Sequence, residues 1–135
     1  MTRTARCSCG QLAITVAGEP RIVVLCNCTE CQRRTGSAFG VGAYFAHDAV
    51  THIEGRHKKY RRSSDSGRSA ESHFCPECGT TVYWQLELFP NEYGIAVGCF
   101  TEPSFPQPKI AVWSATKHDW VEFPNECRVL EGQGG

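Results

Sequence analysis

The chain has 135 residues, enough for a single domain with a hydrophobic core of its own. Lysine plus arginine equals aspartate plus glutamate, at 14 each, so the formal net charge is zero. A zero net charge argues against nucleic acid or a membrane surface as the main partner, because both favour an excess of positive charge.

The N-terminal residues Met1–Arg6 lack the apolar core of a signal peptide. No stretch approaches the ~20 apolar residues that a membrane-spanning helix needs. We therefore expect a cytoplasmic protein with no membrane association.

Short stretches of alternating or β-branched apolar residues predict strands along most of the chain. We expect strands over residues 11–18, 22–25, 40–45, 50–53, 81–86, 93–97, 110–113 and 120–123. One or two helical turns are expected over Thr29–Arg34, with Thr29 as N-cap and Gly36 as C-terminal cap. These elements predict a mostly β domain over residues 1–135, with at most short helical turns.

The segment Arg56–Arg62 carries five cationic side chains. We favour a solvated strand or hairpin arm, and the alternative is a cationic rim that attracts an anionic ligand. Residues 63–67 are polar and end in glycine, so a loop is expected there. The tail, from about residue 128 to 135, is expected to be flexible.

Nine cysteines are too many for an ordinary cytosolic domain, and either disulfides or metal could explain them. The count is odd, and the expected compartment is reducing, so we favour metal. Seven of the nine fall in three clusters: Cys7 and Cys9; Cys26, Cys28 and Cys31; Cys75 and Cys78.

The segment Cys26-x-Cys28-x2-Cys31 lets three thiolates converge on one metal ion, whereas tetrahedral zinc needs four ligands. The first histidine downstream is His47, so no fourth ligand follows nearby. Either the fourth position is open, as in a catalytic site, or a distant residue fills it.

The segment Cys75-x2-Cys78-Gly79 is typical of a zinc knuckle, since glycine allows the positive φ of its tight turn. Cys7 and Cys9 would complete a closed structural site with Cys75 and Cys78, which leaves the other three as the open site. The spacing leaves two alternatives: Cys31 could join the knuckle, or Cys99 could complete the triad. The five histidines are scattered, and His73, two residues before Cys75, is the one nearest to a cluster in sequence.

Taken together, Cys7-x-Cys9-Gly10, then Cys26-x-Cys28-x2-Cys31 running into Thr35-Gly36-Ser37-Ala38-Phe39, and Phe74-Cys75-x2-Cys78-Gly79-Thr80 resemble the glutathione-dependent formaldehyde-activating enzyme family. The late residues Lys109-Ile110, Ser114, Lys117 and Trp120 resemble its C-terminal pattern. The resemblance implies a β-tent fold of stacked antiparallel sheets that zinc stabilises. It also implies two zinc ions per chain: a structural one on Cys7, Cys9, Cys75 and Cys78 and a catalytic one on Cys26, Cys28 and Cys31.

The activity that the resemblance implies is the addition of glutathione to formaldehyde, giving S-hydroxymethylglutathione, a detoxification step classed as a carbon–sulfur lyase. Its partners would be a small-molecule thiol and an aldehyde. Arg33 or Arg34 could offset the negative charge of the site or hold a glutathione carboxylate. Zinc held by three thiolates is expected to be lost more easily than zinc held by four. The alternative function is a non-enzymatic zinc-stabilised scaffold of the same fold.

Overall fold

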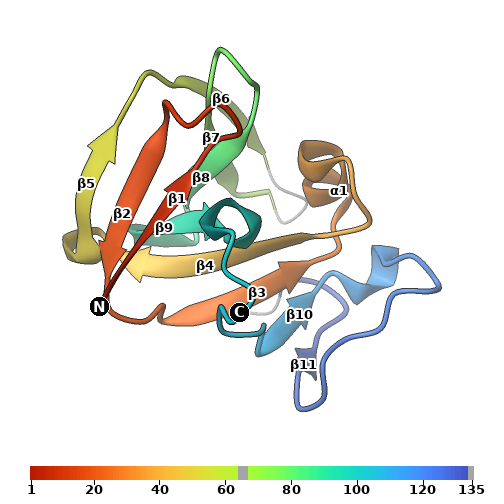
Figure 1. Cartoon of the computed structure of the whole chain (residues 1–135). Helices are drawn as coiled ribbons and strands as arrows, with labels where there is room; N and C mark the ends of the chain where they lie inside the picture. The colour runs from red at the N-terminus through yellow and green to blue at the C-terminus, as the bar shows by residue number, and fades with distance from the viewer. Residues whose placement is uncertain (64–66, 134–135) are drawn as a thin grey trace.

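The computed structural model describes residues 1–63 and 67–133, and this part of the chain forms two β-sheets and one α-helix (Figure 1). The small sheet is antiparallel, with the order β1-β2-β5. Its strands are β1 (Thr2–Arg6), β2 (Ala13–Ala17) and β5 (Val50–Glu54). The prediction of a mostly β domain with short helical turns is confirmed.

The large sheet has the order β11-β10-β3-β4-β9-β8-β7-β6. Its strands are β3 (Ile22–Cys26), β4 (Gly40–Ala46), β6 (Lys58–Ser63), β7 (Ser69–Phe74), β8 (Thr81–Leu86), β9 (Phe89–Ala96), β10 (Ile110–Val112) and β11 (Arg128–Val129). The strands pair antiparallel, except that β10 runs parallel to both β3 and β11. The expectation of purely antiparallel sheets is therefore wrong at this one edge.

The core lies between the two sheets because the strands alternate their side chains. Ile14 and Val16 of β2 pack in one cluster with Ala43 and Phe45 of β4, and all four are buried. Residues Gly42 and Tyr44 of β4 therefore point to the opposite face of the large sheet. That face carries the cleft described below.

Three glycines on this opposite face make room for two large side chains, Trp84 and Arg34. A Cβ atom on Gly94 would lie 2.2 Å from Trp84 Nε1, and one on Gly42 would lie 2.5 Å from Trp84 Cζ2. A Cβ atom on Gly40 would lie 2.5 Å from a terminal nitrogen of Arg34. The indole of Trp84 therefore lies against the sheet, in a trough that side chains on β4 and β9 would fill.

Helix α1 (Thr29–Thr35) follows β3 directly. Its N-cap is Cys28, whose Sγ accepts a hydrogen bond from the backbone N–H of Cys31 at 3.3 Å. The expectation that Thr29 caps the helix is therefore wrong by one residue. Gly36 ends the helix at φ 65°, and its N–H donates to the carbonyl of Gln32, as predicted.

The other connections include three short 3₁₀ helices, η1 (His47–Ala49), η2 (Val97–Phe100) and η3 (Ser114–Thr116). The strand expected over residues 120–123 does not form, and the Trp120 side chain is 71% exposed. Strands β1, β7 and β11 were not predicted, because they are polar or very short. The described helices include none long and apolar enough to cross a membrane.

The tail after residue 128 has defined contacts in the structure. Leu130 N–H donates to the carbonyl of Ala111, and Gln133 Oε1 accepts from Trp113 Nε1 at 3.1 Å. Whether this segment moves in solution stays a prediction. Residues 64–66 of the expected loop and residues 134–135 lie outside the described residues.

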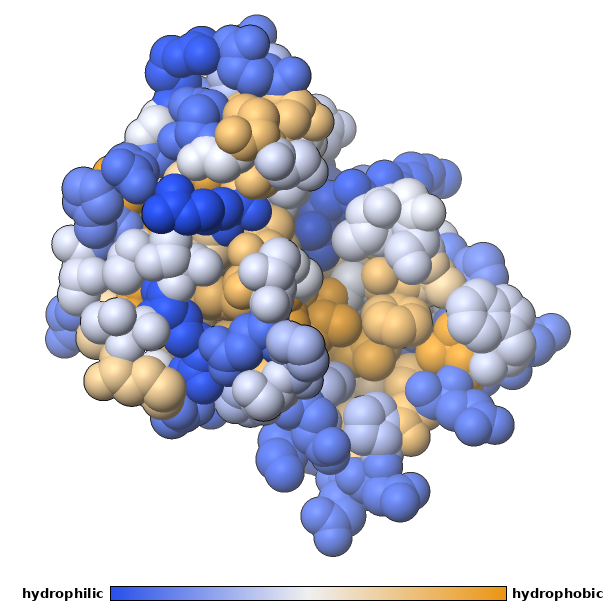
Figure 2. All heavy atoms as spheres, in the orientation of Figure 1, coloured by the Kyte–Doolittle hydropathy of each residue, from blue (hydrophilic) through white to orange (hydrophobic). Residues whose placement is uncertain are grey.

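Figure 2 shows that hydrophilic side chains cover most of the domain on the face in view, and that apolar side chains gather between the body and the lobe of α1 and β10. This lobe also carries the exposed Trp120. Helix α1 lies between β3 and β4 in the sequence, and its side chains contact Trp84 of β8 and Arg62 of β6.

We predict that Gly94→Ala destabilises the domain by about 1–3 kcal/mol, because the new methyl group must displace the Trp84 indole. Urea unfolding followed by tryptophan fluorescence measures the change. Gly98→Ala is the matched control, since a Cβ atom there meets nothing within 4 Å. Equal stability of the two variants would contradict the close packing of the Trp84 indole against Gly94.

Candidate metal centres and the adjoining cleft

The first cluster joins two turns that are far apart in the sequence. Cys7 and Cys9 lie in the β1–β2 turn, and Cys75 and Cys78 lie in the β7–β8 turn. The Sγ atoms of Cys7 and Cys9 are 3.6 Å apart, and those of Cys9 and Cys75 are 3.7 Å apart. Tetrahedral zinc with Zn–S bonds of about 2.3 Å places its sulfur ligands about 3.8 Å apart, so this cluster fits zinc.

The two turns are also joined by a hydrogen bond, and their backbones have similar conformations. The backbone N–H of Ser8 donates to Thr80 Oγ1 at 3.1 Å. Gly10 and Gly79 each follow a cysteine and take positive φ, at 84° and 79°, which glycine adopts without strain. The positive φ expected at Gly79 is therefore confirmed.

Nitrogen donors surround the sulfur atoms of this cluster. The backbone N–H groups of Leu12 and Glu77 donate to the Sγ atoms of Cys7 and Cys75, at 3.3 and 3.4 Å. Hydrogen bonds from Thr80 lower the pKa of the Cys78 thiol to about 5. Donors aimed at sulfur favour thiolates, which are the form that zinc binds.

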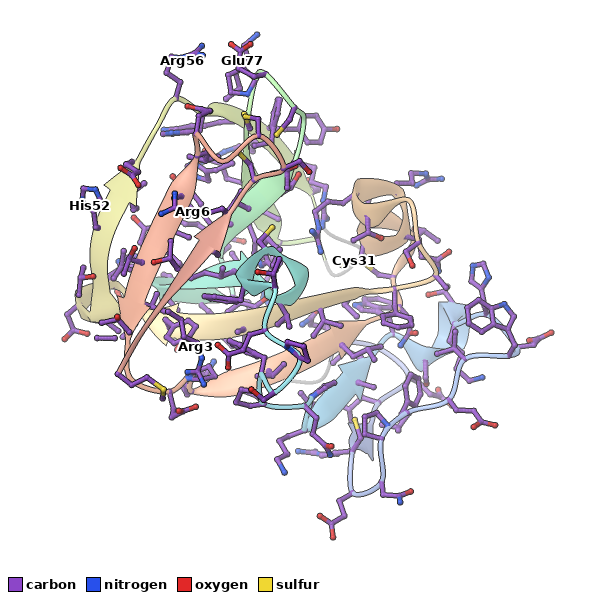
Figure 3. All side chains as sticks on the ribbon, in the orientation of Figure 1. Arg3, Arg6, Cys31, His52, Arg56 and Glu77 are labelled. Atoms are coloured by element: carbon purple, nitrogen blue, oxygen red, sulfur yellow. The ribbon has the colours of Figure 1, made fainter. Side chains whose placement is uncertain are left out.

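Gln11 contributes a side-chain donor to this cluster that was not predicted from the sequence. Its Nε2 lies 3.0 Å from Cys75 Sγ and 2.7 Å from the carbonyl oxygen of Arg56, while its Oε1 accepts from the Arg56 backbone N–H at 2.9 Å. Arg56 in turn pairs with Glu77 at 2.7 Å, and Figure 3 shows these two side chains next to each other. Gln11 thus fixes the β5–β6 connection against the cluster.

The second cluster lies where β3 passes into α1. Cys26 ends β3, Cys28 caps α1, and Cys31 lies in its first turn, as the label in Figure 3 indicates. Their Sγ atoms lie within 4.8 Å of one another, and no fourth histidine, cysteine or carboxylate among the described residues joins the group. Helical geometry brings Cys28 and Cys31 onto one side because they are three residues apart.

The three thiols are close enough to shift one another's pKa values. Hydrogen bonds from Cys26 and Cys31 lower the pKa of Cys28 to about 2, and the same contact with Cys28 raises the pKa of Cys26 strongly. Three thiolates at this separation repel one another, so all three ionise together only around a cation. The donor set therefore fits a soft divalent metal such as zinc.

A buried asparagine holds the loop of this second cluster in place. Asn27 is fully buried, and its Nδ2 donates to the carbonyl of Val112 at 2.9 Å. The backbone carbonyl of Asn27 accepts from Gln32 Nε2 and from Thr116 Oγ1, both at 2.9 Å. The parallel strand β10 and the segment after it therefore fix the cysteine loop.

The second cluster opens into a cleft on the face of the large sheet that the small sheet leaves uncovered. The volume of the cleft that the centre of a water molecule can reach is about 80 Å³. Its apolar wall includes Val24, Tyr44, Trp84, Leu86, Leu88, Val112 and Trp113, and its polar side includes Arg34, Arg62, Arg68, Ser69, Ser72 and Gln133.

The two arginines proposed from the sequence lie in different places. Arg34 lines the cleft, and its guanidinium carbon lies 4.3 Å from the centre of the Trp84 ring. Arg33 does not line the cleft: its side chain is 73% exposed and pairs with Glu30 at 3.0 Å. The suggestion that Arg33 serves the triad is therefore not supported by its position.

Arg62 is a cleft residue that the sequence analysis assigned to a solvated arm. The preceding residues of β6, Lys58–Arg61, are exposed as expected. The Arg62 side chain is only 17% exposed, and its Nε lies 3.8 Å from Glu30 Oε2. The residues before Arg62 show no alternation between apolar and polar side chains that would separate it from Arg61.

The structure supports neither of the two alternative assignments of the cysteines. Cys99 Sγ contacts the carbonyl of Thr81 at 3.9 Å and belongs to neither group of sulfur atoms. Cys31 groups with Cys26 and Cys28 and not with the knuckle. His73 is buried and stacks on Tyr83 with ring centres 4.5 Å apart, so it packs in the core.

Comparisons with known proteins agree with this description. The model of one family, "Glutathione-dependent formaldehyde-activating enzyme", matches residues 2–116. A crystal structure of a Rhodobacter sphaeroides protein, a structural genomics target, superimposes with a TM-score of 0.53 at 23% sequence identity. The match covers 71% of this chain and 85% of that chain, and at this identity it concerns the fold alone. A search of curated proteins finds no match to this chain.

We predict different consequences for the loss of one cysteine in each cluster. Cys75→Ser should lose one zinc and lower the unfolding midpoint by several degrees or abolish folding, because its cluster joins β1–β2 to β7–β8. Cys31→Ser should lose the other zinc and stay folded. Zinc analysis and circular dichroism of the purified variants measure both. Complete unfolding of Cys31→Ser would show that the triad is structural.

We predict that Gln11→Leu weakens zinc retention at the four-cysteine cluster by about 10- to 100-fold, the usual effect of removing a hydrogen bond to a ligand. Zinc release to a chromogenic chelator measures the change. Gln107→Leu, on the proline-rich segment, is the control and should release zinc like the wild type. A Gln11→Leu variant that holds zinc equally well would contradict this role.

Proposed function

Since this chain belongs to the family of glutathione-dependent formaldehyde-activating enzymes, we propose that it adds glutathione, or a related thiol, to formaldehyde or another small aldehyde. With glutathione and formaldehyde the product is S-hydroxymethylglutathione, and the reverse reaction is that of a carbon–sulfur lyase. The observation that carries this proposal is the triad Cys26, Cys28 and Cys31, which opens into a cleft and lacks a fourth ligand among the described residues.

The chemistry of the triad supports a thiol as the incoming ligand. Zinc held by these three cysteines would stabilise a fourth sulfur ligand as its thiolate. The triad thiolates and zinc together carry a charge of about −1, and an incoming thiolate adds another. Arg34 and Arg62, both in the cleft wall, offset this charge, because the charge of Arg62 favours the thiolate of Cys28 and that of Arg34 favours the thiolate of Cys31.

The proposed reaction is an addition with no redox step. The thiolate sulfur forms a bond to the carbonyl carbon, the π bond of the carbonyl breaks, and the oxygen takes up a proton. The proton that the thiol loses is the one that the product hydroxyl gains, so the step balances. Thiols add to formaldehyde without a catalyst, so the cleft contributes mainly by holding both reactants in position.

Residues of the cleft wall restrict water around the reacting sulfur. Trp84 and Val112 are almost fully buried, and they stand on strands on either side of the cysteine loop. The four-cysteine cluster follows the C-terminal end of β7, whereas Ser69 at the N-terminal end of this strand lines the cleft. The cluster would act as a structural zinc site. In this proposal the protein acts in the cytoplasm and is not a scaffold for another protein.

We predict that the protein speeds the exchange between free formaldehyde and S-hydroxymethylglutathione above the rate in buffer. Exchange NMR with ¹³C-formaldehyde and glutathione at equilibrium measures both rates in one sample. Cys28→Ser should reduce the rate to that of buffer, because it removes a triad ligand. Cys99→Ser, outside both clusters, is the control and should keep full activity.

An exchange rate equal to that of buffer for the wild-type protein with two bound zinc ions would contradict the enzymatic proposal with glutathione. If that protein also binds no thiol, the scaffold alternative is the better account. If it binds other thiols, a panel of small aldehydes tested with them would identify the reaction.

A further inference from the structure

The cleft beside the cysteine triad has a second feature, its arginines: Arg34, Arg62 and Arg68 all line it, and the first two come from separate elements next to the triad. Arg34 comes from the last turn of α1, and Arg62 comes from β6 at the edge of the large sheet. Both line the cleft together with Cys28 and Cys31. Formaldehyde carries no charge, so guanidinium groups that line the cleft suit an anionic group better than they suit the aldehyde.

Arg34 is held in place by contacts that leave its hydrogen-bond donors available. The guanidinium stacks on Trp84, and a Cβ atom on Gly40 would collide with its terminal nitrogen. A stacked guanidinium still presents its N–H groups in the ring plane, where they match a carboxylate. Within residues 1–63 and 67–133, Arg34 forms no ion pair and no hydrogen bond that fills these positions.

Arg62 is oriented from the other side of the cleft. Glu30 Oε2 lies 3.8 Å from its Nε, and the other oxygen of Glu30 binds Arg33 at 3.0 Å. Glu30 therefore holds Arg62 by a weak contact to one nitrogen, while Arg33 takes the stronger one. The terminal nitrogens of Arg62 stay free of carboxylates among the described residues.

We propose that Arg34 and Arg62 form a carboxylate-binding subsite, so that the cleft selects thiols that carry a carboxylate near the sulfur. This inference rests on the proposed function, since it names the class of thiol that the same site accepts. Glutathione, with two carboxylates, belongs to this class. Neutral thiols of the same size bind poorly, because they leave two half-buried guanidinium groups without a partner.

The test compares 3-mercaptopropionate with its uncharged analogue 3-mercaptopropionamide. Isothermal titration of the zinc-loaded protein gives the dissociation constant of each thiol without any aldehyde. We expect the acid to bind about tenfold more tightly than the amide, as a charge-assisted hydrogen bond gives. Arg34→Met and Arg62→Met should each weaken the binding of the acid more than that of the amide, so that the preference for the acid falls severalfold.

A neighbouring arginine provides the matched control. Arg61→Met removes the same charge from the same strand as Arg62, where Arg61 is 72% exposed and pairs with Glu71. This control should keep the preference for the acid. Sodium propionate, which has no thiol, should compete with the acid in the wild type and not in Arg34→Met.

Other outcomes would overturn the proposal of a carboxylate-binding subsite. If Arg34→Met weakens the acid and the amide equally, the arginines only offset the charge of the sulfurs. If the wild type binds both thiols equally, or neither, the cleft has no carboxylate subsite. A clear preference for the acid without accelerated formaldehyde exchange would support the subsite and contradict the proposed reaction, so the two can fail separately.

Discussion

The structure depends on the convergence of four sulfur atoms from two turns that are 66 residues apart between Cys9 and Cys75. Each turn closes an antiparallel hairpin, one in the small sheet and one in the large sheet. Their contact fixes how the two sheets face each other and encloses the core of Ile14, Val16, Ala43 and Phe45. An uncovered face of the large sheet follows from this arrangement, because the small sheet occupies only one side. The open triad and its cleft lie on that uncovered face.

The large sheet also positions the triad. Strand β3 delivers Cys26, and the short helix that starts at Cys28 adds the other two sulfurs. The buried Asn27 ties this loop to β10, the strand that runs parallel to β3. A rigid ligand loop suits a site that must keep one coordination position open, since a mobile loop could bring in a fourth protein ligand. The two clusters thus have different roles in our account: one assembles the fold, and the other faces the reactants.

Three kinds of feature could be predicted from the sequence. They are the strands with alternating apolar residues, the helix with its Gly36 cap, and both cysteine groups. These features depend on local periodicity or on spacing that metal chemistry restricts. The role of Gln11 could not be predicted, because its partner Cys75 is 64 residues away. Arg62 was hidden in a cationic run, and only the pairing of β6 with β7 shows which side chains face the cleft. The strand expected at Trp120–Phe123 failed because no neighbouring strand pairs with it in the described residues.

The central claim is that the three-cysteine site is open and accepts a thiol, and a native mass spectrum of freshly purified protein tests it most directly. The spectrum is recorded with and without glutathione. Our account predicts two zinc ions per chain and one glutathione adduct that disappears in the Cys28→Ser variant. Two zinc ions with no adduct, even with glutathione in large excess over the protein, would contradict an open thiol-accepting site.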